Sequence, residues 1–356
     1  MDYKQELDNL ILTVIREGGS DLHLGVGRYP AIRVARSLLF LRTQKILTHE
    51  IMIEYLKVML GEEKIKIFLE NQEVDFAYTH VAPDKSQTRL RGNAFIQKGN
   101  LVVALRLVPK VSTFEELHLP PVLEMITKKK QGFFLVVGPV GQGKSTTLAA
   151  IVDKINTDRS EHIITVEDPI EHIFEEKQSI INQREIGIDS KTFSTALTSI
   201  FREDANVIML GEMRDAETIR TAVTAAETGH LVLSTLHTNN AAQTIDRIID
   251  SFPPEQQGQI RIQLSNSLLG IFSQRLVPRV TGGLIPAYEV LLNNAAVGNL
   301  IRESRTHEID VLIETGFENG MIDMNRCLVD LVRQGEISLE NAYAFSFNPK
   351  GLENLF

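Results

Sequence analysis

The sequence is poor in cysteine and in aromatic residues. Its 356 residues include one cysteine and no tryptophan, and aromatic residues make up 6% of the chain. The single cysteine, Cys327, can form neither an intrachain disulfide nor a four-cysteine zinc site. We therefore expect Cys327 to act as a small buried apolar residue.

Long hydrophobic runs are also missing. No stretch approaches the roughly 18 uninterrupted apolar residues of a membrane-spanning helix, so the sequence predicts no transmembrane segment. The polar start Met1-Asp-Tyr-Lys-Gln-Glu6 lacks the pattern of a secretory signal peptide. These absences predict a cytoplasmic protein, and docking onto a membrane complex stays open.

Positive charge is in the minority. The chain has 37 Lys and Arg residues against 46 Asp and Glu residues, which gives a net charge of -9. This acidic balance argues against a broad nonspecific nucleic-acid surface, so we expect no nucleic-acid partner. The hydrophobic content of 43% is ordinary for a globular protein, and the length allows two domains.

The first part of the chain, residues 1–110, predicts a small α+β domain. Apolar residues at helical spacing predict an amphipathic helix over residues 4–17, which Gly18-Gly19 ends. Thr48 is a candidate N-cap of a second helix. Predicted strands cover residues 20–24, 74–78, 88–95 and 102–108. We interpret residues 111–121, in a proline-containing polar stretch, as the linker to a second domain.

The second domain predicts an α/β fold. From Phe133 onward strand and helix patterns alternate, which indicates a parallel sheet flanked by helices. We expect this core over residues 122–275 and a mostly helical subdomain over residues 276–356.

A glycine-rich loop of the form G-x-x-x-x-G-K-[ST] lies between the first predicted strand and helix of this domain. Glycines let backbone N–H groups surround a polyphosphate, and the helix start adds its positive dipole end. We expect Lys144 to contact the outer phosphates and the Ser145 hydroxyl to bind Mg²⁺. The nucleotide-binding residues predicted here are Gly138, Pro139, Val140, Gly141, Gln142, Gly143, Lys144, Ser145 and Thr146.

Acidic residues follow two further apolar strands of the predicted sheet. Glu167 and Asp168 follow residues 162–166, and Glu212 follows residues 207–210. Ligands of parallel sheets bind outside the carboxyl ends of the strands, so these acids should meet the phosphate loop. We expect Glu212 to activate the attacking water and Glu167 and Asp168 to assist the metal, directly or through water.

Two histidines flank the apolar run at residues 231–233. His237 follows it, at the edge where a phosphate would be contacted, whereas His230 follows Gly229 at a predicted helix end. For His230 a structural hydrogen bond is an equally open alternative to nucleotide binding. A shared metal site is disfavoured because residues seven apart on one strand face opposite sides.

Arginines often complete a nucleotide site from outside the phosphate-binding domain. Arg89, Arg91 and Arg106 of the first domain are candidates, and ordinary sheet-surface charge is the alternative. The run Lys128-Lys-Lys130 is better explained by cations in the last turn of a helix than by an anion site.

Four segments together resemble the secretion ATPase superfamily. Besides the phosphate loop they are His162–Glu171, Gly211–Asp215 and Thr228–Thr238, which match the family's aspartate box, divergent Walker B segment and histidine box. The resemblance extends from Gly19-Ser-Asp-Leu-His-Leu24 to Asn348-Pro-Lys-Gly-Leu352, so it covers almost the whole chain.

The resemblance implies a PAS-like N-terminal domain joined to a RecA-like ATPase domain, assembled as a hexameric ring that uses ATP and Mg²⁺. It implies that Glu212 is the catalytic glutamate, that Glu167 supports water and magnesium, and that the histidine box senses the γ-phosphate. The arginines at 89, 91 and 106 would close over the nucleotide. The ring would act on the cytoplasmic face of an inner-membrane pilus platform.

Within the superfamily the chain is most similar to the branch that retracts type IV pili. It begins at the PAS-like domain and lacks zinc cysteines, unlike assembly and type II secretion ATPases. Ala296-Val-Gly-Asn-Leu-Ile-Arg-Glu303 resembles the branch motif A-I-R-N-L-I-R-E, with Gly298 at the first arginine. Arg33-Val-Ala-Arg36 stands where relatives commonly have R-V-D-G, and we expect it to alter a surface turn.

Three other functions remain as alternatives. Gly298 motivates an accessory retraction paralogue that binds nucleotide and acts in a hetero-complex. A pilus assembly or type II secretion ATPase is a second alternative. A nucleic-acid translocase on the same core is a third, and the acidic balance opposes it.

Overall fold

Two sheets organise the chain, one in each of two units, Met1–Lys110 and Val111–Phe356. The computed structural model describes residues 2–34, 37–82 and 87–356. The turn expected at Arg33-Val-Ala-Arg36 therefore lies partly outside the described residues. Among the described residues, no helix is both long enough and apolar enough to cross a membrane.

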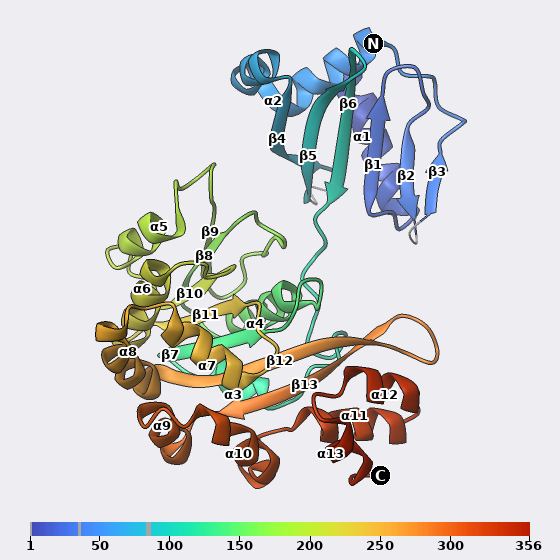
Figure 1. Ribbon diagram of the computed structural model, residues 1–356. Coiled ribbons are helices and arrows are strands. Elements are labelled where there is room, and N and C mark those ends of the chain that lie inside the picture. Colours follow the sequence, from blue (N-terminus) through green and yellow to red (C-terminus); the bar gives the residue numbers. More distant parts are fainter. Residues whose placement is uncertain (1, 35–36, 83–86) are drawn as a thin grey trace. The chain divides into compact units, whose positions relative to one another are not determined.

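The first unit is an antiparallel sheet with helices packed on one face (Figure 1). Its strand order is β3-β2-β1-β6-β5-β4. Its elements are α1 (Tyr3–Arg16), β1 (Asp21–Gly25), β2 (Ala31–Val34), β3 (Ser37–Phe40), α2 (His49–Asn71), β4 (Glu73–Val81), β5 (Gln87–Gln97) and β6 (Asn100–Leu107).

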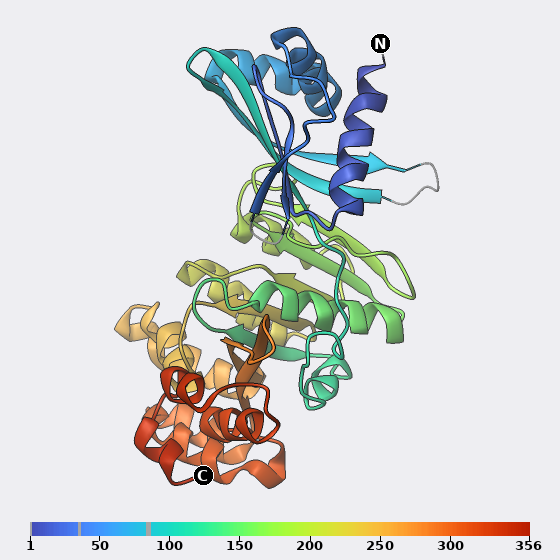
Figure 2. The same cartoon turned by 90° about the vertical axis from the view of Figure 1, so that its right-hand side faces the viewer.

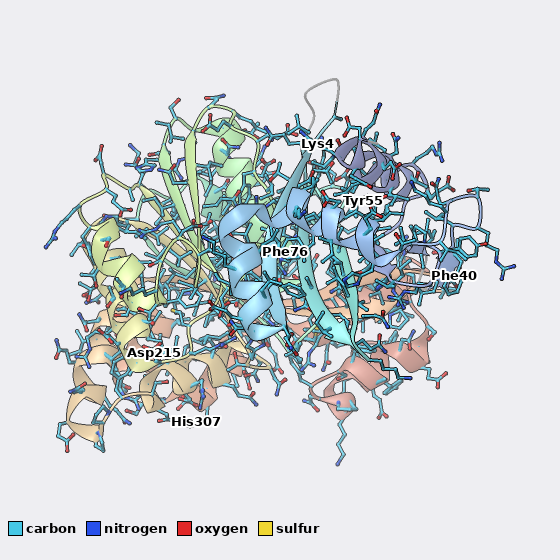
Figure 3. All side chains as sticks on the ribbon, turned by 90° about the horizontal axis from the view of Figure 1, so that it is seen from above. Lys4, Phe40, Tyr55, Phe76, Asp215 and His307 are labelled. Atoms are coloured by element: carbon cyan, nitrogen blue, oxygen red, sulfur yellow. The ribbon has the colours of Figure 1, made fainter. Side chains whose placement is uncertain are left out.

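Alternation along the strands gives this sheet one apolar and one polar face. Leu22 of β1 and Leu105 of β6 belong to the same buried core as α1 and α2. Tyr55 of α2 and Phe76 of β4, labelled in Figure 3, also belong to it. The predicted first helix is confirmed, and so is the N-cap Thr48, whose hydroxyl accepts a hydrogen bond from the Ile51 N–H.

The second unit contains a mostly parallel sheet in the order β13-β12-β7-β11-β10-β8-β9. Only β13 runs antiparallel to its neighbour, β12. The strands are β7 (Gly132–Val137), β8 (His162–Glu167), β9 (Ile180–Glu185), β10 (Val207–Leu210), β11 (Leu231–Leu236), β12 (Leu268–Pro278) and β13 (Leu284–Leu292). The predicted α/β fold class is confirmed.

Helices cover both faces of this sheet because its strands are apolar on both sides. Phe133 and Leu135 of β7 pack against the side of α5–α8, whereas Phe134 and Val136 pack against α3 and α4. The helices along the sheet are α3 (Leu123–Thr127), α4 (Lys144–Asp158), α5 (Phe193–Ile200), α6 (Ala216–Glu227), α7 (Ala241–Asp250) and α8 (Pro254–Ser267).

The end of the chain forms a helical layer beside β13 (Figure 1 and Figure 2). Its elements are α9 (Ala295–Arg302), η1 (Thr306–Glu308), α10 (Ile309–Thr315), η2 (Phe317–Asn319), α11 (Met324–Arg333), α12 (Leu339–Phe345) and α13 (Pro349–Glu353). Cys327 of α11 is buried, as expected.

Two segment boundaries differ from the expected ones. The boundary expected between residues 275 and 276 falls inside β12, because this strand pairs with β7 and β13 and continues the central sheet. Residues 111–121, expected as a linker, contribute Phe114 to the core of the second unit, with 6% of that residue exposed.

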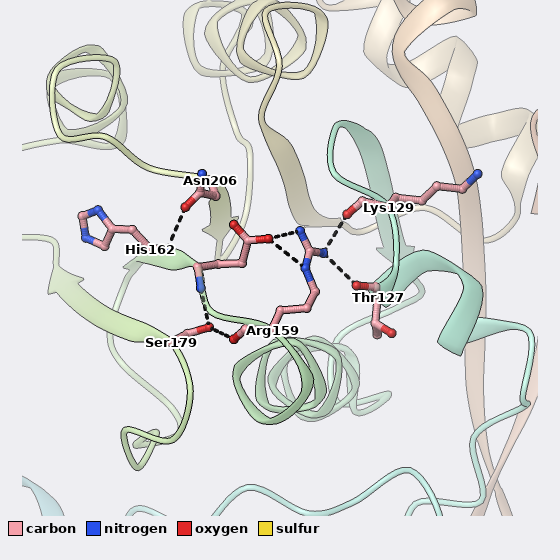
Figure 4. Close-up of polar contacts among 7 residues, drawn as sticks. Thr127, Lys129, Arg159, His162, Ser179 and Asn206 are labelled. Carbon is pink, nitrogen blue, oxygen red and sulfur yellow. Dashed lines mark hydrogen bonds and ion pairs between the residues drawn. The ribbon is translucent and has the colours of Figure 1, made fainter.

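A cluster of polar contacts joins the segment before β8 to the end of α3 (Figure 4). The Arg159 guanidinium donates to the backbone oxygens of Thr127 and Lys129, at 2.8 and 2.7 Å. It also pairs with Glu161 at 2.7 Å. These bonds satisfy carbonyl groups at the end of α3 and fix where β8 begins.

Candidate functional site

The phosphate loop joins β7 to α4, as the sequence predicts. Gly138, Gly141 and Gly143 have φ values of 150°, 77° and 77°, which favour glycine. A Cβ atom on Gly138 would also lie 2.5 Å from the Gln274 backbone oxygen. No side chain caps the start of α4, so its first N–H groups are left for an anion.

A pocket of about 580 Å³ lies at the carboxyl edge of the sheet. The strands β7, β11, β10 and β8 are neighbours there, so the segments that follow them come together. Residues predicted from the sequence that line the pocket are Val140, Gly141, Gln142, Gly143, Lys144, Ser145, Thr146, Glu167, Asp168, Glu212 and His237. The volume is in the range of small-molecule sites.

Lys144 is the most enclosed cation of this pocket. Its Nζ atom donates to the backbone oxygens of Gly138 and Pro139, both at 2.8 Å, and lies 3.2 Å from Nδ1 of His237. Burial lowers the pKa of the Lys144 ammonium, and the negative charges of Glu212 and Glu171 oppose that shift. The loop carbonyls therefore hold the ammonium at the floor of the phosphate cradle.

Glu212 follows the end of β10 after one intervening residue, Gly211, and lines the pocket, with 15% of its side chain exposed. Its carboxylate is paired with Arg214, and its Oε2 atom lies 3.5 Å from Nε2 of His237. The Thr235 hydroxyl donates to the Gly211 backbone oxygen at 2.6 Å, which ties β10 to β11 at this point. The two carboxylate oxygens of Glu212 are thus contacted by two different side chains, Arg214 and His237.

Glu167 is buried at the end of β8. Its Oε1 atom accepts hydrogen bonds from Thr165 at 2.8 Å and from Gln183 at 3.2 Å, and its Oε2 atom accepts one from the Glu171 N–H at 3.2 Å. Burial raises the pKa of Glu167, and these hydrogen bonds oppose the shift. Asp168, the next residue, is exposed and lines the same pocket.

His230 is not brought to the pocket. It lies at the start of β11, roughly 20 Å along the strand from His237. Its Nδ1 atom lies 3.0 Å from the Ala225 backbone oxygen, and its ring packs edge-on against Phe201 at 5.6 Å. His230 therefore makes a structural hydrogen bond, which was the alternative to nucleotide binding, and we leave it out of the site.

The three candidate arginines belong to the first unit. Arg91 of β5 and Arg106 of β6 are cross-strand partners on the polar face of the sheet. The Arg106 Nε atom donates to Asp21 at 2.8 Å, and Arg89 donates to Thr79 at 2.8 Å.

Sequence patterns did not reveal Gln274 of β12, which is 3% exposed. It donates to the Gln142 backbone oxygen at 2.7 Å and accepts from the Thr147 hydroxyl at 2.6 Å. Gln274 shares its strand face with the apolar residues Phe272 and Leu276, and this placement is the signal that could have revealed it, since buried amides are nearly always paired. The pairing of Arg214 with Glu212 was also missed.

The donor set suits a nucleotide-bound magnesium ion better than a metal held by the protein alone. Among the described residues, no group of three or more histidine, cysteine or acidic side chains could hold a metal ion. Ser145 and Asp168 offer hard oxygen donors in the pocket, and magnesium typically takes one or two such ligands together with phosphates.

Comparisons with known proteins agree with this geometry. The chain is 42% identical over 338 residues to the type IV pilus retraction ATPase PilT of Pseudomonas aeruginosa, covering 95% of this chain and 97% of that protein. It is 39% identical to the type IV pilus ATPase PilU of the same organism, covering 95% of this chain and 88% of that protein.

A solved structure of the pilus retraction motor PilT with bound ADP superposes with a TM-score of 0.89. It is 44% identical in sequence, and 98% of each chain is covered. The family model described as Type II/IV secretion system protein matches residues 5–283. The chain therefore belongs to the Type II/IV secretion system protein family.

Proposed function

We propose that this protein is an ATP-hydrolysing motor that powers type IV pilus retraction. The observation that carries the proposal is the meeting of Lys144, Glu212 and His237 in one pocket beside the phosphate loop. The high identity to a pilus retraction ATPase over nearly the whole length supports the retraction branch.

Each group has a defined task in hydrolysis. The loop N–H groups and Lys144 bind the phosphates, and they stabilise the negative charge that develops in the transition state. Glu212 orients the attacking water and accepts its proton. His237 lies between Glu212 and Lys144. In the proposed mechanism it contacts the γ-phosphate of ATP and responds when hydrolysis removes that phosphate.

Magnesium supplies charge neutralisation of the phosphates when it is bound with ATP. The Ser145 hydroxyl would be its direct protein ligand. Both Glu167 oxygens already accept hydrogen bonds, so Glu167 assists through water, together with the exposed Asp168.

We propose a homohexameric ring in which Arg89, Arg91 and Arg106 complete a nucleotide site. The Arg106 Nε atom donates to Asp21 while 71% of the Arg106 side chain stays exposed, so the guanidinium is accessible to a ligand. The ring works at the cytoplasmic face of the inner membrane, against a platform protein of the pilus base.

The test combines purified protein and a deletion strain. Lys144→Ala and Glu212→Gln should each abolish ATP turnover by the purified protein. Deletion should abolish twitching while surface pili persist, and the wild-type gene, but not Glu212→Gln, should restore motility. Loss of surface pili on deletion would contradict a retraction motor and favour an assembly ATPase.

An accessory retraction ATPase is the second candidate, and Gly298 favours it. A Cβ atom at Gly298 would lie 3.4 Å from Nη1 of Arg302, which donates to the Ser265 hydroxyl at 3.0 Å. An arginine at 298 would therefore stand beside a like charge and displace Arg302. If this chain is an accessory retraction ATPase, Gly298→Arg should increase pilus retraction relative to Gly298→Ala. Equal retraction in the two variants would mean that the glycine at position 298 has no functional effect.

A further inference from the structure

The phosphate loop packs against the strand β12, and the side-chain amide of Gln274 extends from this strand to the loop. Its nitrogen donates to the Gln142 backbone oxygen at 2.7 Å, and its oxygen accepts from the Thr147 hydroxyl at 2.6 Å. Because a carbonyl oxygen only accepts, the amide nitrogen must face Gln142. The amide therefore has one orientation, fixed at both ends.

This contact determines the direction of one peptide plane in the loop. In a trans peptide the carbonyl of Gln142 and the N–H of Gly143 point in opposite directions. Since the carbonyl points to β12, the Gly143 N–H points away from β12, toward the pocket that Gly143 lines. An anion-binding loop needs its N–H groups in that direction.

A second set of contacts holds the same part of the loop. The Gln142 side-chain oxygen accepts a hydrogen bond from the Leu276 N–H at 2.6 Å. A Cβ atom on Gly143 would lie 3.0 Å from the Gln274 amide nitrogen. The loop is therefore packed against β12 and hydrogen-bonded to it at Gln274 and at Leu276.

We propose that Gln274 is a positioning residue that keeps the phosphate loop in its anion-binding form. Gln274 does not line the pocket, so it acts through the Gln142–Gly143 peptide and not by touching the nucleotide. The inference rests on the nucleotide binding proposed above. A purely structural role for Gln274 would predict lower stability with unchanged affinity.

The substitution Gln274→Glu keeps the shape of the side chain, replaces the donor to Gln142 with an acceptor and adds one negative charge. A carboxylate opposite the Gln142 carbonyl repels it and frees the peptide to rotate. Thr147→Val removes the hydroxyl that orients the amide, and Thr147→Ser keeps it. Gln259→Glu, on the exposed surface of α8, introduces the same charge away from the loop.

The measurement is the dissociation constant of fluorescently labelled ADP with Mg²⁺ for the full chain, alongside the melting temperature. We expect Gln274→Glu to weaken binding about tenfold or more and Thr147→Val to weaken it less, since a buried carbonyl without a partner disfavours the bound loop. Thr147→Ser and Gln259→Glu should bind like the wild type.

Wild-type affinity in both Gln274→Glu and Thr147→Val would overturn the inference, even if their melting temperatures fell. Should Gln274→Glu fail to fold, unchanged affinity in Thr147→Val alone would overturn it. A wild-type protein that does not bind the labelled ADP would instead refute the proposed function.

Discussion

The Nδ1 atom of His237 lies 3.2 Å from the Nζ atom of Lys144. A lysine ammonium can only donate, so Nδ1 accepts and we infer that the ring proton is on Nε2. That atom faces the Glu212 carboxylate, 3.5 Å away. The histidine ring therefore connects Lys144, proposed to bind phosphate, with Glu212, proposed to activate the attacking water.

Loss of this connection should slow hydrolysis. We expect His237→Ala to lower kcat about ten- to a hundredfold, because Glu212 and Lys144 lose the group that orients them. Steady-state ATPase assays measure this effect. His230→Ala, at the opposite end of β11, is the matched control and should keep wild-type kcat. Equal losses in both variants would contradict the role given to His237.

Glu212 should matter for turnover more than for binding. Glu212→Gln keeps the shape of the side chain but removes the base, so kcat should fall at least about a hundredfold. Affinity for labelled ADP with Mg²⁺ should stay within a few fold of wild type. Glu217→Gln, an exposed position in the first turn of α6, serves as the control. An active Glu212→Gln enzyme would remove Glu212 from the proposed mechanism.

The buried Glu289 of β13 should make stability depend on pH. Its Oε1 atom accepts hydrogen bonds from the Ala241 N–H at 2.9 Å and the Ser273 hydroxyl at 3.1 Å. Burial, opposed by the bond from Ala241, raises the pKa of Glu289 from 4.5 to about 7. Between these values the folded protein holds a proton that the unfolded chain has lost.

The stability from this group is therefore complete below the unfolded pKa of 4.5 and is lost as the pH rises through about 7. The shift corresponds to about 3 kcal/mol at most. Glu289→Gln should remove this loss, so its free energy of unfolding should fall less than that of wild type as the pH rises from about 5 to about 8. Urea unfolding measures it, with the exposed Glu340→Gln as control. Parallel pH profiles in wild type and Glu289→Gln would rule the effect out.

Arg159 should stabilise the second unit without affecting its chemistry. Its side chain is 15% exposed and bonds the Thr127 and Lys129 carbonyls as well as Glu161. We expect Arg159→Ala to lower the free energy of unfolding by about 1–3 kcal/mol, since it leaves acceptors without a partner. Thermal unfolding tests this, and the exposed Arg202→Ala should have no effect. A large fall in kcat at low temperature would contradict a purely structural role.

Much of the candidate site could be predicted from the sequence because the relevant information is local. The spacing of glycines and Lys144 after a strand defines a phosphate loop, and the residues that follow parallel strands must gather at one edge of the sheet. Glu167, Asp168, Glu212 and His237 were found in this way, and all line the pocket.

Pairwise contacts could not be predicted in the same way. His230 and His237 flank the same strand, and only the length and direction of β11 separate them into a structural residue and a site residue. The expected subdomain boundary failed for a similar reason. Residues 268–278 form one strand because both edges of that strand are paired.

The fold class, the phosphate loop and the set of polar residues at the sheet edge follow from the amino-acid sequence alone, because short-range periodicity and strand order in the chain suffice for these. The folded chain was needed to show that His237 contacts Lys144 across 93 residues of chain and that Gln274 holds Gln142 across 132 residues. Such contacts depend on which strands become neighbours and in which register. Packing of the whole sheet sets both, and no local pattern encodes them.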